Sequence, residues 1–277
     1  MTTPETRSSP KVCLSIAGLD PSGGAGILID VKTFMAFGCY GAAAVTSVTF
    51  QNTVGVFGAE HQMAESVRRQ VEPIFDDITV DAVKTGMLPT EAVIVETARM
   101  MRSNGVQKLV VDPVVRSTSG FDLIDNAALR AMVEHLFPLA AIVTPNLPEA
   151  ERLTGIAIET VADIVECARI IRSFGVSNVL IKGGHFDGLK SASRRATDHL
   201  FMGEKHIEID GEYHETTATH GTGCTLAAAI TANLALGFEM VEAVEIAKRF
   251  VNDAIRNAPM IGKGHSPIGI RPISRSG

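Results

Sequence analysis

Residues 12–34 read VCLSIAGLDPSGGAGILIDVKTF, and a change of pattern within them decides the fold class. Val12–Ala17 is a short apolar run, typical of a strand buried on both faces, and Ala25–Phe37 has helical spacing. The glycine-rich loop between them lets the backbone approach a ligand closely and places amide N–H groups at a helix start. This order predicts the first unit of a doubly wound α/β fold, with ligands at the carboxyl ends of the strands.

The same alternation continues along the rest of the chain. Further strands are expected at 43–50, 81–84, 108–112, 141–144 and 178–182, and helices at 64–75, 90–103, 126–137 and 162–174. Residues 197–202 and 206–209 predict a β-hairpin, after which two long helices are expected. No low-complexity linker divides the chain, so we expect a disordered polar tail over 1–10 and a single domain over 11–277.

The composition limits the classes of function. The 277 residues are 45% apolar with a net charge of −6, which favours a packed core and gives no field for binding nucleic acid or an anionic membrane. The start of the chain lacks the apolar segment of a signal peptide. The apolar stretch Leu226–Phe238 is shorter than the roughly 20 residues needed to span a bilayer. We therefore expect a cytoplasmic protein that binds neither nucleic acid nor membrane.

A second informative segment is THGTGCT at 219–225, which precedes a run of small apolar residues. Glycines before a helix present unpaired amides and the helix dipole at one point, which suits negative charge on a transferring phosphoryl group. We expect Gly221, Thr222 and Gly223 to form this anion hole. Cys224 falls in the first helical turn, where a thiol should have a lowered pKa and could act as a general base or nucleophile. A structural role as a buried thiol stays open.

Polar side chains also stand where the predicted strands end. Asp112 ends one strand, Asn146 and Glu149 follow the next, and Lys182 ends another. Mg²⁺ prefers oxygen ligands and needs only one or two carboxylates, while an ammonium group suits phosphate. Each residue taken singly fits a structural role equally well. Together with the anion hole, they predict a magnesium-nucleotide site at one edge of the sheet.

Other enzyme classes are disfavoured because their motifs are missing. Ile29 stands where the last glycine of a dinucleotide-binding GxGxxG would fall, and the sequence has no Walker A motif and no GxSxG elbow. His185 and His220 flank the predicted active-site loops, but the spacing of neither suggests a metal cluster. His61, His135 and His199 have no visible partner in the sequence, so we expect them at the surface or at helix caps.

The motifs in combination resemble those of the hydroxymethylpyrimidine and phosphomethylpyrimidine kinases of thiamine biosynthesis, members of the ribokinase-like superfamily. The resemblance extends from residue 11 to about 270, and it rests on SIAGLDPSGGAGILIDVKTF (15–34), FQNTVGV (50–56), KTGML (84–88), VVDPV (110–114), TPNLPEAERL (144–153), IKGGH (181–185) and THGTGCT (219–225). It implies a ribokinase-like three-layer α/β/α sandwich with a mostly parallel central sheet, and a homodimer.

The resemblance also implies an activity. It is that of an ATP- and Mg²⁺-dependent kinase that phosphorylates 4-amino-5-hydroxymethyl-2-methylpyrimidine and then phosphorylates the monophosphate to the diphosphate. Motif by motif, the pyrimidine pocket falls on Ala25, Asp30, Val48, Gln51 and Met87. The nucleotide phosphates fall on Asn146, Lys182 and Lys263, the metal on Asp112 and Glu149, and the catalytic position on Cys224 beside Gly221, Thr222 and Gly223. A glutamine amide, with both a donor and an acceptor, suits an aminopyrimidine edge.

Two departures from the family pattern are informative. Residues 115–120 read VRSTSG where many members carry Ala-Lys-Ser-Gly, and we expect Arg116 to help hold phosphate. Ribokinase-like sugar kinases mostly have aspartate where Cys224 stands, which favours the pyrimidine or pyridoxal branch. Three alternatives stay open: a pyridoxal kinase, a non-catalytic pyrimidine-binding protein of the same fold, and a cysteine-dependent acyl-transfer enzyme.

Overall fold

The computed structural model describes residues 9–115, 123–183 and 195–273. Its strands are β1 (Val12–Leu19), β2 (Tyr40–Gln51), β3 (Val56–His61), β4 (Ala82–Thr85), β5 (Leu109–Val111), β6 (Ile142–Val143), β7 (Asn178–Ile181), β8 (Asp198–Met202) and β9 (Lys205–Ile209). They form one sheet in the order β3-β2-β1-β4-β5-β6-β7-β8-β9. The strands from β2 to β7 in this order are parallel, whereas β3 at one side and β8 and β9 at the other are antiparallel.

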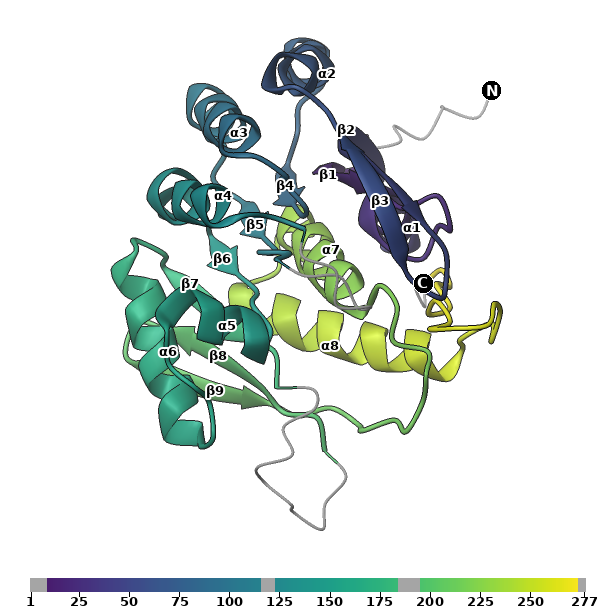
Figure 1. The fold of residues 1–277 in the computed structure, drawn as a ribbon, viewed down its shortest axis with the longest axis vertical. Helices are drawn as coiled ribbons and strands as arrows, with labels where there is room; N and C mark the ends of the chain where they lie inside the picture. The colour runs from purple at the N-terminus through teal and green to yellow at the C-terminus, as the bar shows by residue number, and fades with distance from the viewer. Residues whose placement is uncertain (1–8, 116–122, 184–194, 274–277) are drawn as a thin grey trace, which may run out of the picture.

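Helices cover both faces of the sheet. They are α1 (Gly26–Ala36), α2 (Ala64–Asp77), α3 (Glu91–Ser103), α4 (Asn126–Ala131), α5 (Leu147–Thr154), α6 (Val161–Ser173), α7 (Thr222–Leu236) and α8 (Met240–Arg256). Helices α1, α7 and α8 pack on one face, and α2 to α6 pack on the other (Figure 1). The side chains of β5 alternate accordingly: Leu109 and Val111 join one core and Val110 joins the other. The three-layer arrangement with a mostly parallel sheet is confirmed.

Helix α7 lies against the centre of the sheet, in contact with β1, β4 and β5, and between α1 and α8. It is buried on almost all sides because its second half consists of small and aliphatic residues. In the part of the chain that the structure describes, no helix has both the length and the apolar character to cross a membrane.

Two elements were not expected from the sequence. Strand β3 has no continuous apolar run, because most of its residues are partly or fully exposed at the edge of the sheet. Helix α5 has only eight residues and begins at Leu147-Pro148, so its apolar periodicity is too short to recognise. The helix expected over 126–137 is divided, since α4 passes into a π-helix at Met132–Leu136 and a 3-10 turn at Phe137–Leu139.

The expectation of a surface or helix-cap position is correct for His61, which is exposed, and wrong for His199, which is buried. His61 Nδ1 lies 2.9 Å from Ser47 Oγ across the β2–β3 pair. His199 is buried on β8, and its Nδ1 lies 3.0 Å from His206 Nε2 on β9. Strand pairing brings each histidine to its partner, across 14 residues of chain for His61 and 7 residues for His199.

Candidate active site

A cavity of about 1390 Å³ opens where the parallel strands end. Because these strands share one direction, the residues that follow them meet at one edge of the sheet. The cavity is lined by most of the residues predicted for the site: Ala25, Gln51, Met87, Asp112, Asn146, Glu149, Lys182, Gly221, Thr222, Gly223 and Cys224. The structure therefore brings together segments that are up to about 200 residues apart in the chain.

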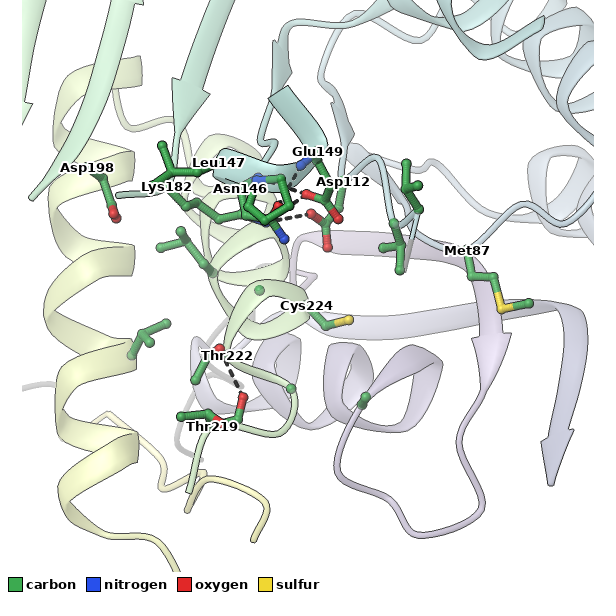
Figure 2. A pocket seen from close by; sticks show the side chains of 18 of the residues that line it. Met87, Asp112, Asn146, Leu147, Glu149, Lys182, Asp198, Thr219, Thr222 and Cys224 are labelled. Carbon is green, nitrogen blue, oxygen red and sulfur yellow. Dashed lines mark hydrogen bonds and ion pairs between the residues drawn. The ribbon is translucent and has the colours of Figure 1, made fainter. Parts of the chain in front are cut away.

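One wall of the cavity carries an acid–lysine group made of Asp112, Glu149 and Lys182 (Figure 2). Lys182 Nζ lies 3.0 Å from Asp112 Oδ1 and 3.9 Å from Glu149 Oε2. Burial alone would lower the pKa of Lys182, but the two carboxylates raise it above its ordinary value. Burial raises the pKa of Glu149 to about 7 despite the nearby ammonium. Because this wall carries two acidic side chains and one basic side chain, it favours the binding of an additional cation.

Asn146 and Glu149 also build the start of α5. Glu149 N–H donates to Asn146 Oδ1 and Asn146 N–H donates to Glu149 Oε2, each at 2.8 Å, which is a capping box. The Asn-x-x-Glu spacing was a signal for this helix start. In the described structure, the capping box fixes the Glu149 carboxylate beside Lys182.

The first turn of α7 faces this wall. Gly221 has φ +85°, and a Cβ at this position would overlap the carbonyl oxygen of Gly24. A Cβ on Gly223 would stand 3.3 Å from Lys182 Nζ and 4.0 Å from Asp112 Oδ2. The backbone of the α7 start therefore touches the loop after β1 on one side and approaches the acid–lysine group on the other. Its amides, which lack intrahelical acceptors, are available to an anion there.

A second link joins the same two loops. Asp20 Oδ2 lies 2.7 Å from His220 Nε2 and accepts the N–H of Ala25 at 2.9 Å, while Oδ1 accepts the N–H of Ser22 at 2.8 Å. Burial by itself would raise the pKa of Asp20. The hydrogen bonds from His220 and Ser22 outweigh burial and lower this pKa from 3.8 to about 2. The charged Asp20 side chain thus links the loop after β1 to the loop before α7.

Cys224 points from the first turn of α7 toward the side of the cavity where Met87 lies (Figure 2). The expectation of a lowered pKa is wrong: burial raises the pKa of this thiol to about 11. Lys84 and the backbone of Gly26 oppose the shift, but the charges of Asp30 and Asp112 add to it. The thiol is therefore neutral at physiological pH.

Residues 20–269 match the family described as phosphomethylpyrimidine kinase. The chain belongs to this family. The hydroxymethylpyrimidine/phosphomethylpyrimidine kinase of Bacillus subtilis (strain 168) is 41% identical over 254 residues, which are 92% of this chain and 92% of that protein.

Solved structures agree with this assignment. The phosphomethylpyrimidine kinase of Clostridium difficile 630 has a TM-score of 0.77 and 41% identity, covering 88% of this chain and 99% of that chain. The pyridoxal kinase of Staphylococcus aureus in complex with AMP-PCP and pyridoxal has a TM-score of 0.87 and 33% identity, covering 97% of this chain and 96% of that chain. The ribokinase-like fold is confirmed, and the kinase family makes the chain a phosphotransferase.

Three residues assigned by the family resemblance do not line the cavity of this kinase. Asp30 is fully buried behind it, where its Oδ2 accepts hydrogen bonds from Lys84 Nζ at 2.8 Å and Ser15 Oγ at 2.6 Å. Val48 is a partly buried residue of β2. Lys263 is exposed, and its N–H donates to Thr53 Oγ1 at 3.2 Å. Arg116, Gly184 and His185 lie outside the described residues.

Lys84, Asp198 and Lys248 line the cavity but were not singled out from the sequence. Lys84 is fully buried in β4, directly after the apolar Ala82 and Val83, and this position requires a counter-charge. Asp198 Oδ1 accepts the N–H of Gly183 at 3.0 Å, and its Oδ2 accepts from Lys248 Nζ at 2.7 Å. Lys248 belongs to the buried stripe of α8, and a lysine on such a stripe was a usable signal.

The glycines at the two ends of α7 allow a matched test of the contact between Gly221 and the loop after β1. Gly221 and Gly237 both have positive φ, but a Cβ on Gly237 would meet nothing within 4 Å. Gly237→Ala should cost only the strain of a left-handed alanine, about 1–2 kcal/mol of unfolding free energy, with kcat retained. Gly221→Ala should in addition displace the start of α7 and lower kcat about 100-fold. Urea unfolding and steady-state kinetics measure both effects. Equal kcat in the two variants would contradict the proposed close contact.

Asp20 makes folding stability depend on acid pH. Its folded pKa is about 2 against 3.8 unfolded, so the stabilisation is complete above pH 4 and is lost as the pH falls toward 2. The full effect is about 2 kcal/mol. The free energy of unfolding of Asp20→Asn, measured with urea from pH 7 to pH 2, should lie below that of the wild type at pH 5–7. The difference in unfolding free energy between the variant and the wild type should narrow between pH 4 and pH 2. A difference that stays constant over this range would contradict the lowered pKa of Asp20.

Proposed function

We propose that this chain phosphorylates 4-amino-5-hydroxymethyl-2-methylpyrimidine with ATP and then converts the monophosphate to the diphosphate, as a step of thiamine biosynthesis. One observation carries the proposal: a single cavity contains Cys224, the anion-binding start of α7 and the acid–lysine group. Family membership supports the reaction class. The volume of about 1390 Å³ is large enough for a small ring and a nucleotide together.

The pyrimidine is proposed to bind between the loop that follows β1 and Met87, which lies just after β4. Ala25, Gln51 and Met87 line this side of the cavity, and Gln51 offers an amide for the aminopyrimidine edge. Thr49 Oγ1 donates to the carbonyl of Leu19 at 2.9 Å and so holds β2 beside this loop. Asp30 is proposed to act through Lys84, which it holds against the cavity wall.

The nucleotide phosphates are proposed to lie between Lys182 and the first turn of α7. The AMP-PCP complex of the similar pyridoxal kinase supports the use of ATP. The donor set here fits Mg²⁺, because Asp112 and Glu149 offer hard carboxylate oxygens. Asp112 Oδ1 accepts from Lys182 and Thr144, at 3.0 and 3.1 Å, while Oδ2 lies nearer the α7 start. Bound Mg²⁺ would offset the charge of the transferring phosphate.

The two proposed steps differ in whether they require Cys224 as a general base. A hydroxymethyl group must lose a proton when it attacks, so a base within reach accelerates the first step. The nucleophile of the second step is a phosphate oxygen, and a phosphate monoester with a second pKa of about 6 is already ionised at neutral pH. Cys224 is therefore proposed as the base of the first step only, acting through the small thiolate fraction that a pKa of about 11 allows.

Two further features belong to this proposal. Four free cysteines and the use of ATP support a cytoplasmic location. The edge strand β3 and its neighbour β2 expose apolar side chains, among them Phe57 at 69% and Phe50 at 52%, and this supports a homodimer formed through that edge.

A pyridoxal kinase is the second candidate, since the similar Staphylococcus aureus structure contains pyridoxal. Measuring ADP release with the hydroxymethylpyrimidine, its monophosphate and pyridoxal decides between them. We expect the highest kcat/KM with the hydroxymethylpyrimidine and clear turnover of the monophosphate. Absence of turnover with the monophosphate would exclude the two-step reaction, and a preference for pyridoxal would favour the alternative. No ADP release with any of the three would favour a non-catalytic binding protein.

Cys224→Ala tests the unequal role of the thiol. The variant should lower kcat for the hydroxymethylpyrimidine by about 10²–10⁴-fold and leave kcat for the monophosphate within a few-fold of the wild type. The wild-type log kcat for the first step should rise with pH between 6 and 9, because the thiolate fraction rises toward its pKa of about 11. Cys167→Ala removes a buried thiol outside the cavity lining and serves as the control. Equal losses in both steps would show that Cys224 is structural.

A further inference from the structure

The hairpin of β8 and β9 carries three side chains with metal-binding groups at the edge of the sheet. His199 lies on β8, and His206 and Glu208 lie on β9. None of them lines the cavity, and the proposed kinase reaction uses none of them. Strand β9 is the last strand of the sheet, so this cluster stands beside a free edge of the described structure (Figure 1).

The strand register places all three side chains on one face. His199 is directly opposite Glu208, and Phe201 is directly opposite His206. Residues 199 and 201 share a face of β8, and residues 206 and 208 share a face of β9, because side chains alternate along a strand. The neighbouring Asp198 belongs to the opposite face, where it pairs with Lys248 at 2.7 Å. The ammonium of Lys248 therefore lies across the sheet from the cluster and is matched by its own carboxylate.

The distances suit a small metal ion. His199 Nδ1 and His206 Nε2 are 3.0 Å apart, and the three ligand atoms, including a Glu208 oxygen, lie within 4.8 Å of one another. Ligands around a tetrahedral zinc with bonds near 2.0–2.1 Å are separated by about 3.3 Å, so small side-chain movements would complete the geometry. The His206 ring is stacked on Phe201, with centroids 4.4 Å apart and planes within 11°. This stacking orients one ligand before any metal arrives.

The burial of the three groups differs in a useful way. His199 is 5% exposed, whereas His206 and Glu208 are exposed. An ion can therefore enter from solvent and bind a ligand fixed in the protein. Two imidazoles and one carboxylate form a donor set typical of zinc, and three protein ligands leave a position for water.

We propose that His199, His206 and Glu208 form a Zn²⁺ site that ties β8 to β9. The metal replaces the direct hydrogen bond between the two imidazoles, since both nitrogens then donate a lone pair to the ion. The cross-strand placement of Glu208 supplies the negative charge that a histidine pair alone lacks. The proposal does not depend on the reaction proposed above, because the cluster lies outside the cavity lining.

Titration of the untagged full-length protein with Zn²⁺ tests the proposal. Isothermal calorimetry of the wild type should show one site, and His206→Asn and Glu208→Gln should each weaken Zn²⁺ binding. For His206→Asn the affinity for Zn²⁺ should fall by at least about 100-fold. This is the upper end of the losses that follow when residues around metal ligands are changed. His135→Asn, which changes a partly exposed histidine remote in sequence, is the matched control and should bind like the wild type. Zn²⁺ binding that is absent, or equal in His206→Asn and the wild type, would overturn the site.

Co²⁺ separates this site from binding at a cysteine. A site made of nitrogen and oxygen ligands gives visible Co²⁺ absorption without thiolate charge-transfer bands, and the visible bands should be lost in His206→Asn. Thiolate bands that survive in His206→Asn would place the metal elsewhere and overturn the proposal. Because Glu208 is exposed, Glu208→Gln should melt like the wild type without metal, whereas His206→Asn loses the contacts of the His206 ring with His199 and Phe201 and should melt lower. Only the wild type should gain thermal stability when Zn²⁺ is added. Kinase activity with Mg²⁺ and ATP should be unchanged in His206→Asn.

Discussion

The contact between the Gly24 carbonyl and Gly221 sets the shape of the candidate site. No side chain fits between these backbones, and Gly221 also adopts a left-handed conformation that favours glycine. The Asp20–His220 pair spans the same junction at 2.7 Å. A loop that follows the first strand is thereby fixed to the start of a helix about 200 residues later. The separation between the proposed pyrimidine side and the proposed anion hole depends on this junction.

Charge around the cavity is arranged locally, in a protein whose net charge is −6. Lys84 and Lys182 are each held by acids, at 2.8 Å from Asp30 and 3.0 Å from Asp112. Burial alone would lower the pKa of Lys84, but the charge of Asp30 raises it, so this fully buried ammonium stays charged. In the proposed function, the positive potential for a polyphosphate would come from these lysines, the α7 start and the proposed Mg²⁺, and a basic surface is not required.

The sequence predicted the parts of the site that follow from topology. Parallel strands end at one edge, so the order of strands and helices is enough to place Asp112, Asn146 and Lys182 together. The pKa of Cys224 could not be predicted in this way, because the helix-start rule is local whereas burial and the charges of Asp30 and Asp112 come from the whole fold. The role of Asp30 was also hidden, since its partner Lys84 is 54 residues away. By contrast, the His199–Glu208 register follows from the expected hairpin with its short Gly203-Glu204 turn, and that signal was present in the sequence.

A neutral thiol at position 224 suits the proposed second step better than a carboxylate would. Ribokinase-like sugar kinases mostly have aspartate there, as the family resemblance implies, and they transfer phosphate to neutral hydroxyl groups. A substrate that already carries phosphate would bring its charge close to such an aspartate. Two like unit charges 4 Å apart repel by about 4 kcal/mol at an effective dielectric constant of 20. Asp112 already adds negative charge to this wall, and Glu149, whose pKa burial raises to about 7, adds more as the pH rises, while Lys182 matches only one of them. Burial keeps the Cys224 thiol uncharged, with a pKa of about 11, so it adds no repulsion when a monophosphate binds. The same burial would weaken Cys224 as the proposed base of the first step, and in the proposed mechanism the α7 start and the lysines would compensate by stabilising the transferring phosphoryl group.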